Sequence, residues 1–297
     1  MTHVRRWSTV LLAALAVGAA CSPDEASVPE PSGPLRSRSP VEGRAFEFAV
    51  IGDFGTGEED QRAVADALRR WAGTRPFEAL VTTGDNIYDS GHPDDFAEAW
   101  HQPYGWVDRG GIPVIASVGN HDIRTASGAP VMELFSMPGR WYAHRFGPVE
   151  LFVLDGNRPA DLRQLTWLGD ALRRSRATWK VAVFHHPAYS CSDHGSTREI
   201  LERWVPVLQA GGVDLVLSGH DHNYQRFRAY GIAFVVSGGG GAALDAVGDC
   251  PAGTPAPLAE LDERHHFLYG RATRTRLTLQ AVPVPGLRPA DRVVLRA

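Results

Sequence analysis

The composition of this 297-residue chain is that of a folded, nearly neutral protein. Hydrophobic residues make up 43% of the chain, enough to bury the core of one large domain or two small ones. The formal net charge is -4 and the isoelectric point is near 6.3. These values give no electrostatic case for binding nucleic acid or anionic membranes.

The first 20 residues have the pattern of an export signal. Two adjacent arginines precede the apolar run 10–17, which is shorter than the ~20 residues of a membrane helix. Cys21 follows small residues, as the lipid-modified cysteine of bacterial lipoproteins does, and ordinary cleavage after Ala20 is the alternative. We therefore predict an exported bacterial protein, either a cell-envelope lipoprotein held by a lipid on Cys21 or a secreted one. The predicted parts are a signal peptide at 1–20, a flexible Pro- and Ser-rich tether at 21–44 and one folded domain at 45–297.

Two cysteines remain for the exported domain. In an oxidising compartment an even pair favours a disulfide, here between Cys191 and Cys250. The alternative is that Cys191 acts as a nucleophile beside His194, although no known motif surrounds it.

Strand-like and helix-like segments alternate along the domain, which predicts an α/β fold with mixed sheets. A hairpin is expected at Gly147-Pro148, and the last three strands are expected to complete a second sheet. Helices are predicted at 58–71, 94–100, 161–173 and 197–209. Strands are predicted at 46–51, 79–83, 113–118, 140–146, 149–154, 179–184, 215–217, 231–237, 266–270, 274–282 and 291–295.

Five of these strands end in side chains that can bind metal ions. In an open α/β sheet, the carboxyl ends of the strands are where ligands bind. Alone, each such residue would more often be a turn or cap residue. Together, carboxylates that can bridge two ions and imidazoles that complete each site favour a centre of two metals. The candidate ligands are Asp53, Asp85, Tyr88, Asn120, His185, His220 and His222.

The order of these motifs resembles that of the calcineurin-like metallophosphoesterases, and among them the small, single-domain purple acid phosphatases. The resemblance covers about residues 46–240. One motif departs from the family pattern, with Ala182 where valine is usual. The motifs are Gly52-Asp53-Phe54-Gly55, Gly84-Asp85-Asn86-Ile87-Tyr88, Gly119-Asn120-His121-Asp122, Ala182-Val183-Phe184-His185 and Gly219-His220-Asp221-His222.

The resemblance implies a four-layer α/β/β/α sandwich of two mixed sheets flanked by helices, with two metal ions bound. Fe(III) would occupy the site that contains Tyr88, and Fe(II), Zn or Mn the other, with Asp85 bridging the two. The first ion would be held by Asp53, Asp85, Tyr88 and His222. The second would be held by Asp85, Asn120, His185 and His220.

The implied function is an acid phosphatase that hydrolyses small phosphate monoesters by attack of a metal-bound hydroxide. A phosphodiesterase or nucleotidase on the same two-metal core is the alternative, and a catalytically silent binding module is a third hypothesis. His121 is the candidate that orients the phosphate or protonates the leaving oxygen, with Asp122 fixing its tautomer. We expect a monomer.

The remaining notable residues have simpler interpretations. The glycine run 238–241 lacks a phosphate-loop pattern and is interpreted as a close-packed turn bordering the site. His92, His186 and His194, on loops near the ligands, are weaker candidates for a role like that of His121 and are interpreted as surface histidines. His265 and His266 are given no role.

Overall fold

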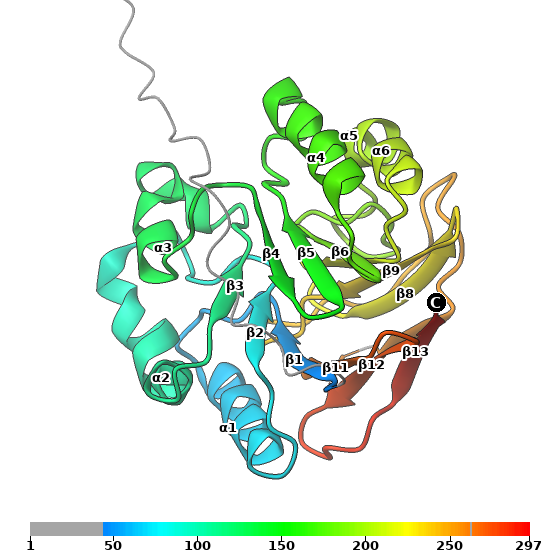
Figure 1. The fold of residues 1–297 in the computed structure, drawn as a ribbon. Helices are drawn as coiled ribbons and strands as arrows, with labels where there is room; N and C mark the ends of the chain where they lie inside the picture. The colour runs from blue at the N-terminus through cyan, green and yellow to red at the C-terminus, as the bar shows by residue number, and fades with distance from the viewer. Residues whose placement is uncertain (1–43, 262) are drawn as a thin grey trace, which may run out of the picture.

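The computed structural model describes residues 44–261 and 263–297 (Figure 1). The predicted signal peptide, and all of the tether but Arg44, lie outside the described residues. Over the described ranges, no helix has the length and apolar character needed to cross a membrane.

Two β-sheets face each other, and helices cover the outer side of each, so the domain has the four layers expected (Figure 1). The first sheet has the strand order β13-β12-β11-β1-β2-β3 and the second β10-β8-β9-β7-β6-β5-β4. The first contains β1 (Phe46–Ile51), β2 (Ala79–Thr82), β3 (Val114–Ala116), β11 (His266–Ala272), β12 (Arg276–Pro283) and β13 (Asp291–Arg296). The second contains β4 (Tyr142–Phe146), β5 (Val149–Val153), β6 (Trp179–Val183), β7 (Leu215–Ser218), β8 (Tyr224–Ala229), β9 (Ile232–Ser237) and β10 (Ala259–Leu261).

The helices divide between the two outer layers, as Figure 1 shows. The first sheet is flanked by α1 (Glu59–Thr74), α2 (Gln102–Arg109) and α3 (Ala129–Leu134). The second is flanked by α4 (Leu162–Arg174), α5 (Arg198–Arg203) and α6 (Val205–Ala210).

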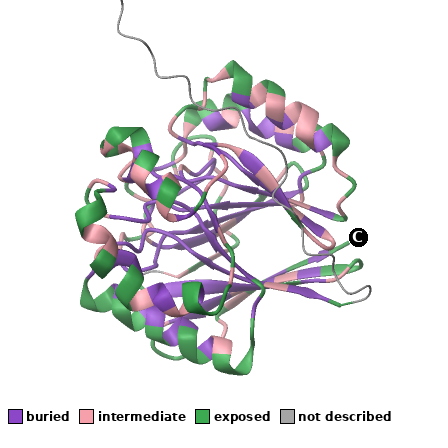
Figure 2. Cartoon of the chain, turned by 60° about the vertical axis from the view of Figure 1, so that its left-hand side comes forward, coloured by how far each residue is buried: buried purple, intermediate pink, exposed green. Residues whose placement is uncertain are grey.

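Alternation along the strands creates the layers, because successive side chains in a strand point to opposite faces. In β1, Phe46, Phe48 and Val50 belong to the core between the sheets. Ala49 and Ile51 face the other way and pack in the core under α1. Most strand residues are buried on both faces, and the exposed residues lie mainly on the outer sides of the helices, in the loops and on the edge strand β13 (Figure 2).

Strand direction brings the predicted motifs together. In the first sheet, β1, β2 and β3 are parallel, and in the second, β5, β6, β7 and β9 are parallel. The expected hairpin joins β4 to β5. The expectation that the last three strands complete a second sheet is wrong, because β11 pairs antiparallel with β1 and places β11, β12 and β13 in the first sheet. The loops after β1, β2, β3, β6 and β7 therefore meet at one edge of the two sheets.

Several boundaries differ from the prediction. The helix expected at 197–209 is two helices that meet at Trp204, where Pro206 supplies no backbone N–H for a continuous helix. The helix expected at 94–100 is a 3-10 turn, Pro93–Asp95, and a π-helical turn, Ala97–His101, which lead into α2. Strands β8 and β10 and helices α2 and α3 were not predicted.

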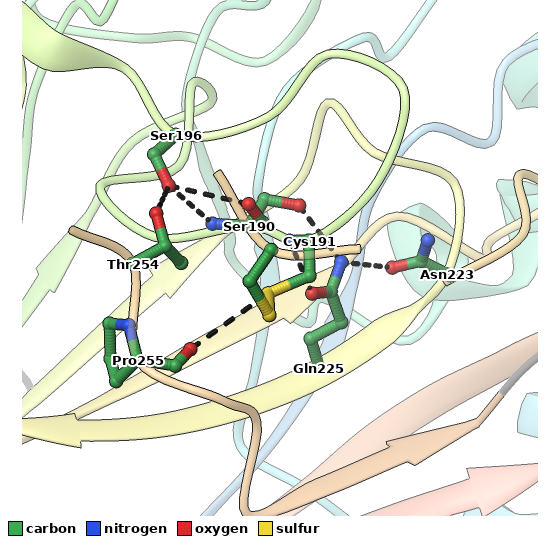
Figure 3. Close-up of a disulfide and its surroundings, with 8 residues drawn as sticks. Ser190, Cys191, Ser196, Asn223, Gln225, Thr254 and Pro255 are labelled. Carbon is green, nitrogen blue, oxygen red and sulfur yellow. Dashed lines mark hydrogen bonds between the residues drawn. A yellow bond between two sulfur atoms is a disulfide. The ribbon is translucent and has the colours of Figure 1, made fainter. Parts of the chain in front are cut away.

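Cys191 and Cys250 form the predicted disulfide, which spans 59 residues and joins the loop after β6 to the loop after β9 (Figure 3). The buried Gln225 supports this region from β8, since its side chain accepts a hydrogen bond from the Cys191 amide and donates to Ser190 and Asn223. Because its sulfur is bonded to Cys250, the alternative interpretation of Cys191 as a nucleophile is wrong.

Candidate metal centre

Four of the seven candidate ligands meet around Tyr88. The Tyr88 hydroxyl lies 3.1 Å from Nε2 of His222 and 3.4 Å from Oδ2 of Asp85. Nε2 of His222 is in turn 3.6 Å from Oδ1 of Asp53. This is the set of side chains expected to hold the first ion.

The remaining ligands meet around His185. Its Nε2 atom lies 3.0 Å from Oδ1 of Asn120, 3.2 Å from Nδ1 of His220 and 3.3 Å from Oδ2 of Asp85. Asp85 therefore contacts both groups, as the bridging position requires. Asp53, Asp85 and His185 offer ligand atoms that all lie within 4.8 Å of one another.

Backbone carbonyls fix which ring nitrogen faces the centre. Nδ1 of His185 lies 3.0 Å from the Thr83 carbonyl, and Nδ1 of His222 lies 2.7 Å from the Ala243 carbonyl. A carbonyl can only accept, so each Nδ1 carries a hydrogen and each Nε2 is the nitrogen that faces the cluster, where it can give a lone pair to a metal ion. Both imidazoles are thus oriented as metal ligands.

The glycines in front of Asp85, Asn120 and His220 are required by packing. A Cβ at Gly119 would collide with Oδ1 of Asp85, one at Gly219 with Oδ2 of Asp53, and one at Gly84 would lie 2.7 Å from Nδ1 of His185. The motifs therefore interlock, because each glycine leaves the space that a ligand from another motif fills.

Three ligands adopt backbone conformations that are uncommon for residues with a side chain. The φ angles of Asp53, Asp85 and His220 are 55°, 47° and 75°. Such angles persist where surrounding contacts hold them, and they concentrate at functional sites. Here, the His220 amide donates to both oxygens of Asp53 and the His121 amide donates to Oδ1 of Asp85.

The electrostatics of the cluster fit bound cations. Burial raises the pKa of Asp53, and burial followed by the nearby Asp53 and Asp85 carboxylates raises that of Tyr88. Burial lowers the pKa of His185, but Asp85 and Asp53 outweigh it and raise the value to about 10. Buried carboxylates are costly unless a positive charge compensates them, and the oxygen and imidazole donors here suit Fe, Zn or Mn.

Asp122 contacts neighbouring loops and not the ring of His121. Its carboxylate accepts hydrogen bonds from the amides of Asn86, Ile87 and Gly119, at 2.9, 3.1 and 2.8 Å. It also accepts one from the Asn86 side chain at 2.7 Å. The expectation that Asp122 fixes the tautomer of His121 is therefore wrong, and the Asp89 carbonyl, 2.8 Å from Nδ1, occupies that position.

His121 lies at the rim of the centre. Its Nε2 atom is 3.9 Å from Oδ2 of Asp85 and 3.2 Å from a terminal nitrogen of Arg124. Arg124 is exposed and also donates to the Asp89 carbonyl. The sequence analysis missed Arg124, whose only signal was its place two residues after the Asn-His-Asp motif.

Three histidines interpreted as surface residues differ in environment. His92 is exposed and its ring accepts from the Asp94 amide, as a surface residue can. His194 is also exposed, but its ring stacks on that of His220 with centroids 4.1 Å apart. For His186 the interpretation is wrong. Its ring packs 4.5 Å from that of His220, its buried Nδ1 has no hydrogen-bond partner among the described residues, and burial lowers its pKa to about 3.

The two histidines without a predicted role are structural. His266 is buried and forms a 3.0 Å hydrogen bond with Ser237, and His265 lies 3.4 Å from Asp60. The glycine run 238–241 is the expected close-packed turn, since the Gly240 amide donates to Gly52 and there is no space for a Cβ at Gly238 beside Asp53.

Comparison with known proteins agrees with this geometry. A family model described as calcineurin-like phosphoesterase matches residues 46–224. The chain belongs to this family.

The chain is 30% identical over 279 residues to purple acid phosphatase 4 of Arabidopsis thaliana, covering 82% of this chain and 81% of that protein. It is 27% identical over 239 residues to tartrate-resistant acid phosphatase type 5 of Homo sapiens, covering 66% and 73%. The chain is thus a metallophosphoesterase related to the acid phosphatases, a family with a binuclear metal centre.

Solved structures show the same fold at low sequence identity. A purple acid phosphatase from yellow lupin aligns with a TM-score of 0.73 and 17% identity, covering 88% of this chain and 55% of that one. GAP50, described as the anchor in the inner membrane complex of Plasmodium, aligns with a TM-score of 0.74 and 16% identity, covering 85% and 89%. Because a phosphatase and an anchor share this fold, activity has to be argued from the site residues.

Proposed function

We propose that this chain is an exported acid phosphatase that hydrolyses small phosphate monoesters at a centre of two metal ions. The observation that carries the proposal is the position of the Tyr88 hydroxyl between His222 and Asp85. The names of the relatives, purple and tartrate-resistant acid phosphatases, favour the same substrate class.

The donor sets differ in a way that favours two different ions. Tyr88, Asp53 and His222 make one side rich in anionic oxygen, which suits Fe(III). Asn120, His185 and His220 supply a neutral amide and two imidazoles, which suit Fe(II), Zn²⁺ or Mn²⁺. When bound, two such ions lower the pKa of water to supply a nucleophile and neutralise charge on the phosphate.

The chain's own residues orient the metal ligands and bind the phosphate ester. The carbonyls of Thr83 and Ala243 hold His185 and His222 with Nε2 toward the centre. His121 and Arg124 lie together at the rim, where their N–H groups can bind phosphoryl oxygens and orient the ester. Because Nδ1–H of His121 donates to the Asp89 carbonyl, a proton for the leaving oxygen has to be carried on Nε2, so His121 acts as the general acid in its imidazolium form.

Export is supported by the N-terminal pattern and by the disulfide, since such bonds persist in oxidising compartments. Lipid attachment at Cys21 and a monomeric state complete the proposal. Mass spectrometry of the mature N-terminus checks the first, because a lipidated Cys21 carries added acyl mass that a plainly cleaved chain lacks.

The substrate class is tested with the purified full chain on an aryl phosphate monoester and the matching diester. We expect kcat/KM for the monoester to exceed that for the diester by at least ~10-fold, a difference of about 1.4 kcal/mol in transition-state stabilisation. The opposite order would support the phosphodiesterase or nucleotidase alternative. No turnover of either, in protein that contains its metals, would support a binding module.

A further inference from the structure

The end of the two sheets at which the parallel strands begin is rich in exposed arginine. These side chains come from the segments before β1 and β6 and from strands β4, β8, β12 and β13. They include Arg44, Arg145, Arg176, Arg228, Arg276 and Arg296. We call the surface that these six arginines form the amino-end face.

Exposed acidic side chains gather at the opposite end, in the loops after β1, β2, β6 and β9 near the metal ligands. They include Glu58, Asp60, Asp89, Asp94, Asp193 and Asp249. The net charge of -4 is therefore an average over a surface on which positive and negative charge are separated.

Contacts between the sheets make the amino-end face continuous. The ring N–H of Trp179, at the start of β6, donates to the Thr273 carbonyl in the turn between β11 and β12. Phe46, at the start of β1, stacks on Phe146 at the end of β4, with ring centroids 4.6 Å apart. The C-terminus lies at the same end (Figure 1). The face thus extends across both sheets.

Most of the arginines on this face are not neutralised by ion pairs. The side chains of Arg176, Arg228, Arg276 and Arg296 form no hydrogen bond or ion pair with the described part of the chain. Arg276 and Arg296 are register partners on neighbouring strands, so two like charges lie side by side. Arg145 donates to two backbone carbonyls, which do not compensate its charge. An anionic partner would relieve this repulsion.

The carboxylates at this end are fewer, and most already have donors. They include Glu47, Glu78, Glu150, Asp170, Asp214 and the terminal carboxylate of Ala297. Glu47 lies 3.1 Å from Arg271, and Glu78 lies 3.6 Å from Arg44. Asp170 is shared by two arginines in the last turn of α4. Positive side chains therefore outnumber negative ones, and the face keeps a net positive charge.

An exposed aromatic side chain accompanies the arginines. Tyr230 lies in the turn between β8 and β9, two residues after Arg228, and 63% of its surface is exposed. Tyrosine is enriched where a membrane meets water, because its ring is apolar and its hydroxyl is polar. Arginines together with this ring favour a lipid surface as the partner.

The predicted tether joins the domain at the amino-end face. Arg44 precedes β1, which begins at Phe46, and Asp53 follows the opposite end of the same strand. Six strand residues separate the two ends by about 20 Å. A lipid on Cys21 would therefore hold the amino-end face toward the membrane and the metal centre away from it.

We propose that the amino-end face binds the surface of an anionic phospholipid bilayer, while the metal centre faces away from the lipid. Arginines within about 10 Å of such a surface are attracted to it at physiological salt. The charge of the whole chain gave no case for this binding, because it averages the amino-end face with the acidic end. The binding is independent of which phosphate ester the protein hydrolyses.

Vesicle binding of the exported chain tests the proposal. The chain from residue 21 onward carries Cys21→Ser, so that no lipid on the cysteine contributes. It is sedimented with vesicles of phosphatidylcholine, with or without phosphatidylglycerol. We expect partitioning at least ~10-fold stronger on the anionic vesicles at low salt, and loss of most of this difference at high salt. Equal binding to both kinds of vesicle would overturn the proposal.

Two variants of equal net charge then locate the binding surface. One combines Arg176→Gln, Arg276→Gln and Arg296→Gln on the amino-end face, and should bind anionic vesicles at least ~10-fold more weakly. The matched control combines Arg158→Gln, Arg264→Gln and Arg288→Gln, which are exposed in loops at the acidic end, and should bind as wild type does. Equal losses in the two variants would exclude the amino-end face as the docking surface.

A comparison with duplex DNA separates a lipid surface from nucleic acid. The same chain is mixed with DNA and with the anionic vesicles at one salt and phosphate concentration. We expect tighter binding to the vesicles. Tighter binding to the DNA would assign the face to nucleic acid and overturn the membrane proposal.

The orientation on the bilayer is measured with a fluorophore on one introduced cysteine. Thr275→Cys lies in the turn between β11 and β12, and Asp94→Cys lies in the loop after β2, and both positions are exposed. A quencher attached to the lipid headgroups should reduce the emission of the label at 275 and leave the label at 94 unchanged. Equal quenching of both, or quenching at 94 alone, would contradict the proposed orientation.

Discussion

The carboxylate of Asp122 accepts hydrogen bonds from both the backbone and the side chain of Asn86, at 2.9 and 2.7 Å. This pair joins the loop after β3 to the loop after β2, and therefore the strands that carry Asn120 and Asp85. The contact makes Asp122 a residue that positions the ligands, whereas the sequence motif suggested a partner of His121.

Replacing Asp122 with Asn tests this structural role. The change places an amide against buried N–H donors, so we expect the free energy of unfolding to fall by roughly 2–4 kcal/mol, the cost of losing hydrogen bonds to a buried charge. Denaturant unfolding measures it, with Asp66→Asn, exposed on α1, as the control. Unchanged stability together with a large loss of kcat would instead restore Asp122 to a catalytic role.

His121→Asn tests the proposed rim role. We expect kcat to fall by about 10²-fold or more, as is typical for loss of a general acid or an oriented donor, while both metals stay bound. His92→Asn is the matched control, because His92 is an exposed histidine on a nearby loop. Loss of metal in His121→Asn would show that the residue acts as a ligand.

The disulfide predicts a stability difference. Reduction, or the double change Cys191→Ser and Cys250→Ser, removes a covalent link between residues 59 apart in the sequence. The unfolded chain then gains conformational entropy, so the free energy of unfolding should fall by about 4 kcal/mol in the chain-entropy model. Unfolding with and without reductant measures it, and intact mass should rise by two hydrogens on reduction. An unchanged mass would contradict the bond.

Asp291 links the two sheets and makes one part of the stability pH-dependent. It accepts hydrogen bonds from Tyr224 and Arg226 of β8. Burial raises its pKa, but these donors outweigh it and bring the pKa below the usual value. A lowered pKa means that the folded state prefers the charged form, so this contribution is present above the unfolded pKa, about 4, and is lost as pH falls through the folded value.

We therefore expect Asp291→Asn to lower the free energy of unfolding by about 1–2 kcal/mol at neutral pH, after allowing for partial exposure. The difference from wild type should shrink as pH falls below ~4. Urea unfolding across this range measures it. A difference that stays constant with pH would mean that packing, and not charge, explains the effect.

Most of the fold could be predicted from the sequence, because buried strands and helices carry periodic apolar patterns. β8 escaped prediction for a physical reason. Gln225 is buried because it binds Cys191, Ser190 and Asn223, and Arg226 is held by Asp291. Polar residues that are satisfied by distant partners give no apolar period, so local reasoning treats them as a loop.

The site also has a part that could be predicted from the sequence and a part that could not. The types and order of the ligands identify the family, and the structure brings all seven together. The surroundings of Asp122 and His186 were not predictable, because side-chain contacts depend on how loops from separate strands pack. His186 follows a ligand and points into the same crowded space, where Gly156 leaves room for its ring.

The most direct test of the account is the visible spectrum and iron content of the purified protein beside those of Tyr88→Phe. The exposed Tyr230→Phe is the control. Wild type and Tyr230→Phe should hold two metals at this centre, one of them iron, with a tyrosinate-to-iron absorption band. Tyr88→Phe should lose the band and at least ~10-fold in activity, the lower bound seen when even supporting residues of a metal site are changed. A band that persists in Tyr88→Phe, or wild-type protein that binds no iron, would contradict the central claim.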